Sequence, residues 1–169
     1  MAPSRIAEQG RRAQAASRVL ARASTHDKDA VLLGAADLLV ERSPELLAAN
    51  DADVASAEEN GVTAAVVDRL RLSRDRIAAM AGGLRTVAGL PDPVGEVTDG
   101  WVRPNGLRVQ RVRVPLGVVA VIYENRPNVT SDAFALCLKS GNAAFLRGSS
   151  AAVESNRAIA HVLHEALNK

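Results

Sequence analysis

The sequence predicts an α/β fold in which an incomplete Rossmann-type nucleotide-binding unit follows a set of helices and a β-ribbon. Residues 117–122 form a continuous apolar run, which is typical of a buried parallel strand. A predicted helix over 131–140 and a second strand over 142–147 complete a βαβ unit. Upstream, apolar side chains recur at helical spacing, and a Pro-Asn-Gly turn signal separates two alternating segments.

Three parts are predicted along the chain. Residues 1–92 supply the N-terminal helices of the nucleotide-binding domain, residues 93–114 form the β-ribbon, and residues 115–169 form the first βαβα portion. The helices of the first part are predicted over 5–23, 28–42, 43–60, 63–70 and from Ser73 through Val87. A last helix is predicted over 151–167.

Capping residues define several of these helices. Asp27 and Ser73 have the side chains that favour helix N-caps, and Ser43 is expected to cap the third helix with Pro44 at its first helical position. The acidic residues Asp51, Asp53, Glu58 and Glu59 are interpreted as a solvated helix face, since no histidine joins them at the spacing of metal ligands.

The ribbon is predicted from two strands, 96–103 and 107–114. The second strand skips one step of its alternation at Gln110-Arg111, which a β-bulge would explain. A charged two-stranded ribbon is marginally stable alone in water, so we expect it to pack on another part of a larger protein or on another subunit as an oligomerisation element.

Composition excludes several classes of protein. The chain has 169 residues, a net charge of +2 and only 2% aromatic residues, so it lacks the basic stripe and stacking aromatics of nucleic-acid binders. A single cysteine suits a reducing compartment, and no apolar run approaches the ~20 residues that span a bilayer. We therefore expect a cytoplasmic protein. The arginine-rich start is open to two interpretations, an amphipathic helix, which we favour, or a transit peptide.

The loop after the first strand of the βαβ unit is the first candidate site. Ligands of open α/β sheets bind outside the carboxyl ends of strands, and Asn125, Arg126 and Asn128 stand there. Arg126 has the geometry to clamp a carboxylate or phosphate, and an asparagine amide can donate to an oxyanion. The alternative is an ordinary turn, since Asn and Pro are common in turns.

The segment Arg147, Gly148, Ser149, Ser150 is the second candidate site. It lies between a strand end and a helix start, where free N–H groups and hydroxyls suit a phosphate. A simple helix N-cap is the alternative. Cys137 is interpreted as a buried structural cysteine, and His161 and His164 as surface or subunit-facing residues, so no metal is expected.

Long segments of the chain resemble one family. Residues 68–96, 103–143 and 145–156, including YENRPN at 123–128 and FLRGSS at 145–150, are similar to the gamma-glutamyl phosphate reductases of the aldehyde dehydrogenase superfamily. The resemblance implies an aldehyde dehydrogenase-like fold. It also implies NADPH-dependent reduction of γ-glutamyl phosphate to glutamate 5-semialdehyde and phosphate in proline biosynthesis, through a cysteine thioester.

The resemblance assigns roles to single residues. Asn125 matches the oxyanion-hole asparagine of aldehyde dehydrogenases, and Arg126, with Asn128 nearby, would meet the anionic substrate. Arg147 takes the place of a lysine that touches the cofactor ribose. Ser150 stands where NAD-preferring relatives carry a glutamate, and a neutral hydroxyl beside a cation tolerates the 2′-phosphate of NADP.

The resemblance covers only an N-terminal portion of much longer enzymes, so the nucleophilic cysteine and the catalytic domain are expected beyond Lys169. We therefore predict that the 169 residues alone have no reductase activity. The full-length enzyme is expected to be a homo-oligomer. Two alternatives are a non-catalytic remnant that only binds partners or oligomerises, and the reductase part of a bifunctional proline-pathway synthase.

Overall fold

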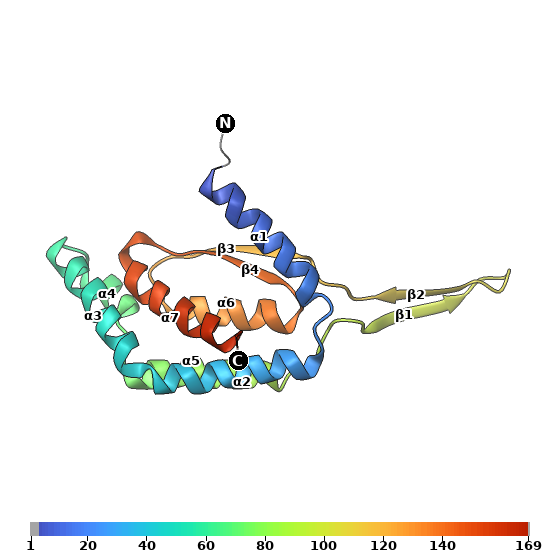
Figure 1. Cartoon of the computed structure of the whole chain (residues 1–169), viewed down its shortest axis with the longest axis horizontal. Coiled ribbons are helices and arrows are strands. Elements are labelled where there is room, and N and C mark those ends of the chain that lie inside the picture. Colours follow the sequence, from blue (N-terminus) through green and yellow to red (C-terminus); the bar gives the residue numbers. More distant parts are fainter. Residues whose placement is uncertain (1–3, 169) are drawn as a thin grey trace.

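The structure, a computed structural model, describes residues 4–168 (Figure 1). Residues 1–3 and 169, which the predicted first and last parts include, lie outside the described residues. The elements in chain order are α1 (Arg5–Leu20), α2 (Thr25–Glu41), α3 (Ser43–Glu59), α4 (Ala64–Leu70), α5 (Arg74–Ala88), β1 (Val97–Val102), β2 (Arg108–Val112), β3 (Val118–Ile122), α6 (Asn128–Lys139), β4 (Ala143–Arg147), the 3₁₀ helix η1 (Ser150–Ala152) and α7 (Val153–Ala166).

The helices pack around one aliphatic core. Helices α2 and α5 lie side by side along one face, and α6 and α7 lie between them and the sheet (Figure 1). Leu32 and Leu39 of α2, Ile77 and Leu84 of α5, and Ile159 of α7 are fully buried there. The helical part and the βαβ part of the chain therefore share this core.

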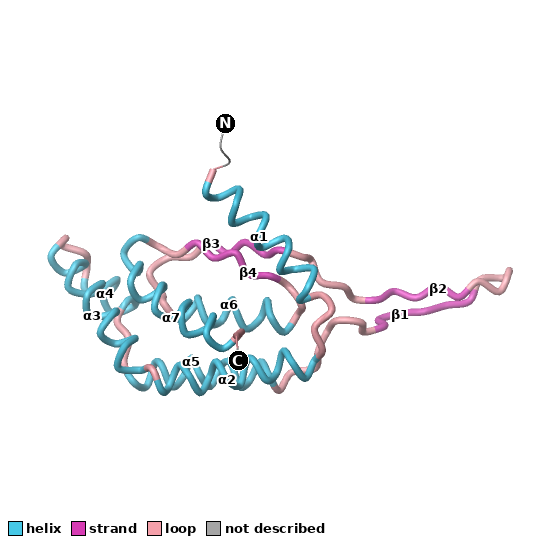
Figure 2. The backbone as a smooth tube through the Cα atoms, viewed as in Figure 1, coloured by secondary structure: helices cyan, strands magenta, loops and turns pink. Residues whose placement is uncertain are grey.

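Strands β3 and β4 form a parallel pair, as the sequence predicts. Val118 lies opposite Ala143 and Ile122 opposite Arg147. The expectation that the first strand is buried is wrong, because Val118 is 39% and Ile122 83% exposed. Within residues 4–168 the sheet has two strands, α6 lies against one face, and α1 covers the other only in part (Figure 2).

Helix boundaries differ from the prediction at three caps. Arg42, and not Ser43, is the N-cap of α3, and the Ser43 hydroxyl donates to the Val40 carbonyl at 2.5 Å instead of accepting from an N–H of α3. Ser24, and not Asp27, is the N-cap of α2, since its Oγ accepts a hydrogen bond from the Asp27 N–H at 3.1 Å. Helix α6 begins at Asn128 with Pro127 as its N-cap, three residues before the predicted start. Its end agrees with the sequence: Gly141 has a φ of +72°, and a Cβ there would lie 2.9 Å from Pro115 Cγ.

Strands β1 and β2 form an antiparallel ribbon that projects from the helical body (Figures 1 and 2). The turn at 104–106 is as predicted, with the Gly106 N–H donating to the Arg103 carbonyl at 2.8 Å. The predicted bulge is on the wrong strand. The register shift lies between Val97 and Asp99 of β1, so the extra residue is Thr98 and not one of the pair at 110–111.

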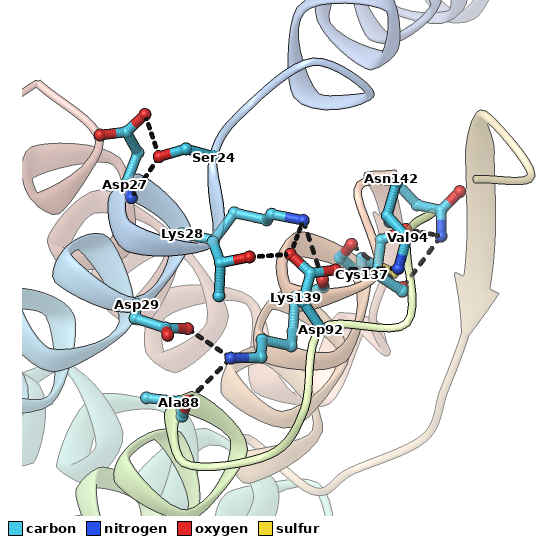
Figure 3. A network of polar contacts seen from close by, with 12 residues as sticks. Ser24, Asp27, Lys28, Asp29, Ala88, Asp92, Val94, Cys137, Lys139 and Asn142 are labelled. Carbon is cyan, nitrogen blue, oxygen red and sulfur yellow. Dashed lines mark hydrogen bonds and ion pairs between the residues drawn. The ribbon is translucent and has the colours of Figure 1, made fainter. Parts of the chain in front are cut away.

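Two buried lysines join the ribbon base to the core (Figure 3). Lys28 Nζ lies 2.5 Å from Asp92 Oδ2, and Lys139 Nζ lies 2.5 Å from Asp29 Oδ1. Lys28 also donates to the Lys139 carbonyl at 3.4 Å, and Lys139 to the Ala88 carbonyl at 2.8 Å. We call Lys28, Asp29, Asp92 and Lys139 the ribbon-base network. It connects α2, the end of α5, the ribbon entry and the end of α6.

Across residues 4–168, every helix is too short or too polar to cross a lipid bilayer.

Candidate functional site

The parallel register of β3 and β4 brings the two predicted site segments to one edge of the sheet. Ile122 and Arg147 are paired, and the Tyr123 N–H donates to the Arg147 carbonyl at 3.1 Å. The loop after β3 and the loop after β4 therefore leave the sheet side by side. Open α/β sheets bind ligands at such a carboxyl edge.

The loop after β3 is short and leads directly into α6. Pro127 is buried with helical backbone angles (φ −58°, ψ −31°), while Arg126 before it is exposed. Asn128 is the first residue of α6, and its Nδ2 donates to Asp132 Oδ2 at 2.9 Å. Arg126 thus extends from a segment that proline and a helix start hold in place.

Arg126 stands between two hollows. A polar pocket of about 450 Å³ lies between the α4–α5 region and the start of α6, and Arg126 and Asn128 line it. A smaller pocket of about 80 Å³ is lined by Arg126, Asn125 and Glu124. The three residues predicted to contact substrate are therefore grouped around adjoining hollows.

The loop after β4 closes tightly on its neighbours. A Cβ on Gly148 would lie 2.3 Å from Asn156 Nδ2 and 3.2 Å from Tyr123 Cζ, so only glycine leaves the backbone this close to both side chains. Thr130 Oγ1 donates to Asn156 Oδ1 at 3.1 Å and accepts from the Tyr123 hydroxyl at 2.6 Å. These bonds hold the Tyr123 and Asn156 side chains in the positions where they lie against the Gly148 backbone.

Ser149 and Ser150 lie at the start of the short helix η1. Ser149 is the N-cap of η1, and its Oγ accepts from the Ala151 N–H at 3.1 Å. The side chains of Arg147 and Ser150 are exposed, and Arg147 donates to the adjacent Gly148 carbonyl. The N-cap alternative from the sequence therefore describes Ser149.

The structure corrects the expectation that the N–H groups at the start of the last helix are free. Asp53 of α3 accepts from the Glu154 N–H at 3.2 Å and from the Ser155 N–H at 2.7 Å. Asp53 also accepts from the Ser155 hydroxyl at 2.6 Å. Asp53 was expected to be solvated, but it is buried because α7 packs its N-terminus on α3.

Arg147 and Arg126 line different hollows. Arg147 lines a groove of about 1030 Å³ that is bordered by α1, the β3–β4 sheet, α6 and the end of α7, and whose other walls are mostly apolar. Arg126 lines the two pockets beside α4. The structure therefore brings the two predicted segments to one edge but turns their arginines toward different hollows.

The remaining reactive side chains are placed as follows. Cys137 is buried in α6, and burial raises the pKa of its thiol, which disfavours the nucleophilic thiolate. His161 and His164 are exposed on α7. Residues 4–168 contain no group of three histidine, cysteine or acidic side chains that could hold a metal ion.

Two residues of interest were not singled out from the sequence. Asp53 was one of four acids grouped by proximity in the chain, and only the packing of α3 on α7 distinguishes it. Arg69 of α4 lines both pockets together with Arg126. Nothing in the sequence separates Arg69 from its neighbours Arg71, Arg74 and Arg76.

Comparison with solved structures identifies the class of fold. A NAD-dependent benzaldehyde dehydrogenase from Corynebacterium glutamicum superposes with a TM-score of 0.64 at 22% identity, over 91% of this chain and 31% of that chain. At this identity the likeness shows the fold alone. The chain has the α/β fold of aldehyde dehydrogenases, as the resemblance implied.

Closer relatives of the chain are gamma-glutamyl phosphate reductases. The chain is 54% identical to the gamma-glutamyl phosphate reductase of Brucella anthropi over 162 residues, which are 96% of this chain and 37% of that protein. The gamma-glutamyl phosphate reductase of Thermotoga maritima superposes with a TM-score of 0.95 at 47% identity, over 98% of this chain and 40% of that one. Comparison with protein-family models finds no match. The chain corresponds in sequence and fold to the N-terminal portion of the gamma-glutamyl phosphate reductases.

Proposed function

We propose that this chain forms the N-terminal, nucleotide-binding part of an NADPH-dependent enzyme of proline biosynthesis. The reaction reduces γ-glutamyl phosphate to glutamate 5-semialdehyde and releases phosphate. The observation that carries the proposal is the 54% identity to a gamma-glutamyl phosphate reductase over 96% of the chain. Because the chain spans 37% of that relative, the activity belongs to a longer polypeptide, and the 169 residues alone are inactive.

The substrate side of the proposal rests on Arg126. Its guanidinium is exposed at the carboxyl edge of β3, and its donors match a carboxylate or phosphate in two parallel hydrogen bonds. Asn128 lines the same polar pocket at the first position of α6, although its amide nitrogen already donates to Asp132. Asn125 lines the small pocket, where its amide would serve as the oxyanion donor.

The cofactor side of the proposal rests on the loop after β4. The backbone at Gly148 lies so close to the side chains of Asn156 and Tyr123 that a Cβ would not fit between them. The path of the backbone is therefore fixed, and a nucleotide can lie beside it. Arg147 and Ser150 are exposed and bring a cation and a hydroxyl. These residues fit the ribose 2′-phosphate, while Ser149 is engaged in capping η1 and contributes its backbone. NADPH would supply the hydride.

The nucleophile is not assigned to this chain. Cys137 is buried in α6 with a raised thiol pKa, and it lines the groove beside α1 rather than either of the pockets that Arg126 lines. We place the catalytic cysteine in the remaining part of the enzyme. Its thiolate would attack the acyl carbon, phosphate would leave, and reduction of the thioester would release the aldehyde and regenerate the thiol.

The direct test replaces the matching segment of the Brucella anthropi relative by this chain. The chimera is expected to oxidise NADPH when γ-glutamyl phosphate is generated in situ, and the isolated 169 residues are not. The unaltered relative is the positive control. A folded chimera without turnover would contradict the proposed activity. Turnover by the isolated chain would contradict the proposal that the 169 residues alone are inactive.

Cofactor choice is tested at Ser150. In the same chimera, Ser150→Glu is expected to lower the preference for NADPH over NADH by about tenfold, because a carboxylate repels the 2′-phosphate. Ser150→Ala is the matched control, which removes the hydroxyl without adding charge. An unchanged cofactor ratio in Ser150→Glu would argue against the loop after β4 as the ribose site.

The proposal includes a cytoplasmic location and a homo-oligomer of the full-length enzyme. The ribbon supports the second point, since Val97, Trp101, Val102 and Leu107 are all at least 42% exposed on it. Exposed apolar side chains on a projecting ribbon fit a subunit contact better than contact with water.

A further inference from the structure

Two exposed arginines meet at the boundary of the two pockets. Arg69 reaches it from α4 and Arg126 from the loop after β3, and each lines both hollows. Among residues 4–168, neither side chain forms an ion pair or a hydrogen bond.

The other arginines of the polar pocket are already neutralised. Arg76 lies 3.2 Å from Asp68 Oδ1 and also donates to the Arg71 carbonyl at 2.5 Å. Arg71 lies 2.9 Å from Glu58. The free positive charge of the pocket is therefore concentrated in Arg69 and Arg126.

Two like charges near one another are unfavourable unless an anion separates them. Guanidinium groups bind carboxylate and phosphate through paired hydrogen bonds, so the pair is suited to one oxyanion. A pocket of about 450 Å³ has the size of a small-molecule site.

The opposite charge is also present in the same pocket. Asp132 of α6 lines it, and only its Oδ2 accepts a hydrogen bond, from Asn128. Oδ1 is directed toward Gly83 of α5, where a Cβ would lie 3.8 Å away, so no side chain from that glycine covers it. A ligand cation can approach Oδ1, and a bare dianion beside this carboxylate would be repelled.

We propose that this pocket binds the amino-acid end of the substrate. Arg69 and Arg126 hold the α-carboxylate, and Asp132 holds the α-ammonium. The inference rests on the proposed function and deepens it, since a γ-glutamyl group carries both charges at the end remote from the acyl phosphate. Arg69 and Asp132 thereby become specificity residues.

The first test is binding to this chain. In arginine Nε–Hε NMR spectra, L-glutamate is expected to shift the resonances of Arg69 and Arg126. Glutarate, which lacks the amino group, is expected to bind at least fivefold more weakly, and inorganic phosphate likewise. No shift with L-glutamate, or equal affinity for phosphate, would overturn the proposal.

The second test is kinetic and separates this inference from the proposed function. In the Brucella anthropi chimera, Arg69→Gln is expected to raise the KM for γ-glutamyl phosphate about tenfold and leave the KM for NADPH within twofold. Asp132→Asn is expected to reduce the preference for γ-glutamyl phosphate over glutaryl phosphate. The matched control is Arg85→Gln, because Arg85 is exposed, paired with Asp37 and outside both pockets.

The outcomes are distinct. A chimera without turnover would contradict the proposed function. The binding test would then decide whether the pocket binds the amino-acid end of the substrate. If the chimera turns over and Arg69→Gln leaves its KM for γ-glutamyl phosphate unchanged, the pocket proposal is contradicted and the proposed function is not. A rise in KM shared by Arg85→Gln would also count against the pocket proposal.

Discussion

The ribbon base and the carboxyl edge of the sheet use positive charge in opposite ways. At the ribbon base, Lys28 and Lys139 have side chains only 1% and 5% exposed, and each is paired with an aspartate. At the carboxyl edge, Arg69 and Arg126 are exposed and have no acidic partner in the described chain. The two lysines are paired within the fold, whereas the two arginines remain available to a ligand.

The difference follows from the cost of burying charge. A buried ammonium loses its hydration, so it persists only where an opposite charge and hydrogen bonds replace the water. Both buried lysines meet that condition through a carboxylate and a main-chain carbonyl. Exposed guanidinium groups stay hydrated and need no partner, so their pairing is free to serve recognition.

The largest effect is expected from Lys28→Met. Removing the ammonium leaves Asp92 partly buried with its main ionic partner gone, so the free energy of unfolding should fall by about 3 kcal/mol. Urea denaturation followed by circular dichroism measures it. Arg85→Met, which breaks an exposed pair with Asp37, should cost about 0.5 kcal/mol or less. Equal losses in both variants would remove the distinction between buried and exposed pairs.

Asp53→Asn should destabilise by about 2 kcal/mol, since hydrogen bonds to charged groups contribute more than neutral ones. The variant places an amide donor against two N–H groups and a hydroxyl that all donate to Asp53. Thermal unfolding provides the measurement. Asp51→Asn is the control, because Asp51 is exposed on the same helix. An unaffected melting temperature in Asp53→Asn would show that α7 does not depend on this cap.

Much of the fold was accessible from the sequence because its signals are local. Apolar spacing predicted α5 from Ser73 onward, the Pro-Asn-Gly turn predicted the ribbon, and Gly141 predicted the end of α6. The errors lie where tertiary contacts decide. The bulge falls on β1 because pairing across the ribbon sets the register, and α6 starts at Asn128 because Pro127 accepts helical backbone angles.

The candidate site was less accessible for the same reason. Arg126 and Asn125 were predicted because a strand end followed by polar residues is a local pattern. Arg69 is 57 residues earlier in the chain, and only the placement of α4 beside the loop after β3 makes it a neighbour. Asp53 was assigned to solvent, since its contact with α7 joins residues 102 positions apart.

Arg126→Gln is expected to affect substrate binding and to leave stability nearly unchanged. It should raise the KM for γ-glutamyl phosphate in the chimera about tenfold, equivalent to about 1.4 kcal/mol, because one charge-assisted pair is lost. The free energy of unfolding of the chain should change by no more than about 0.5 kcal/mol, as for other exposed substitutions. Steady-state kinetics and urea denaturation give the two values. A variant that binds substrate normally but unfolds more easily would place Arg126 with the structural charges.

The smallest effect is a pH dependence of the ribbon base. Burial raises the pKa of Asp92, but hydrogen bonds from Lys28, from the Val94 N–H and from Thr25 outweigh burial and leave that pKa below its usual range. A carboxyl with a lowered pKa in the folded state stabilises the fold above its unfolded pKa of about 3.9, and the stabilisation is lost as pH falls through the folded value. The stability difference between the wild-type chain and Asp92→Asn should therefore be constant from pH 7 to 5 and shrink below about pH 4. Urea denaturation across this range measures the difference, with Asp37→Asn as an exposed control. A difference that grows toward acid pH would mean that Lys28 does not hold Asp92 in its charged form.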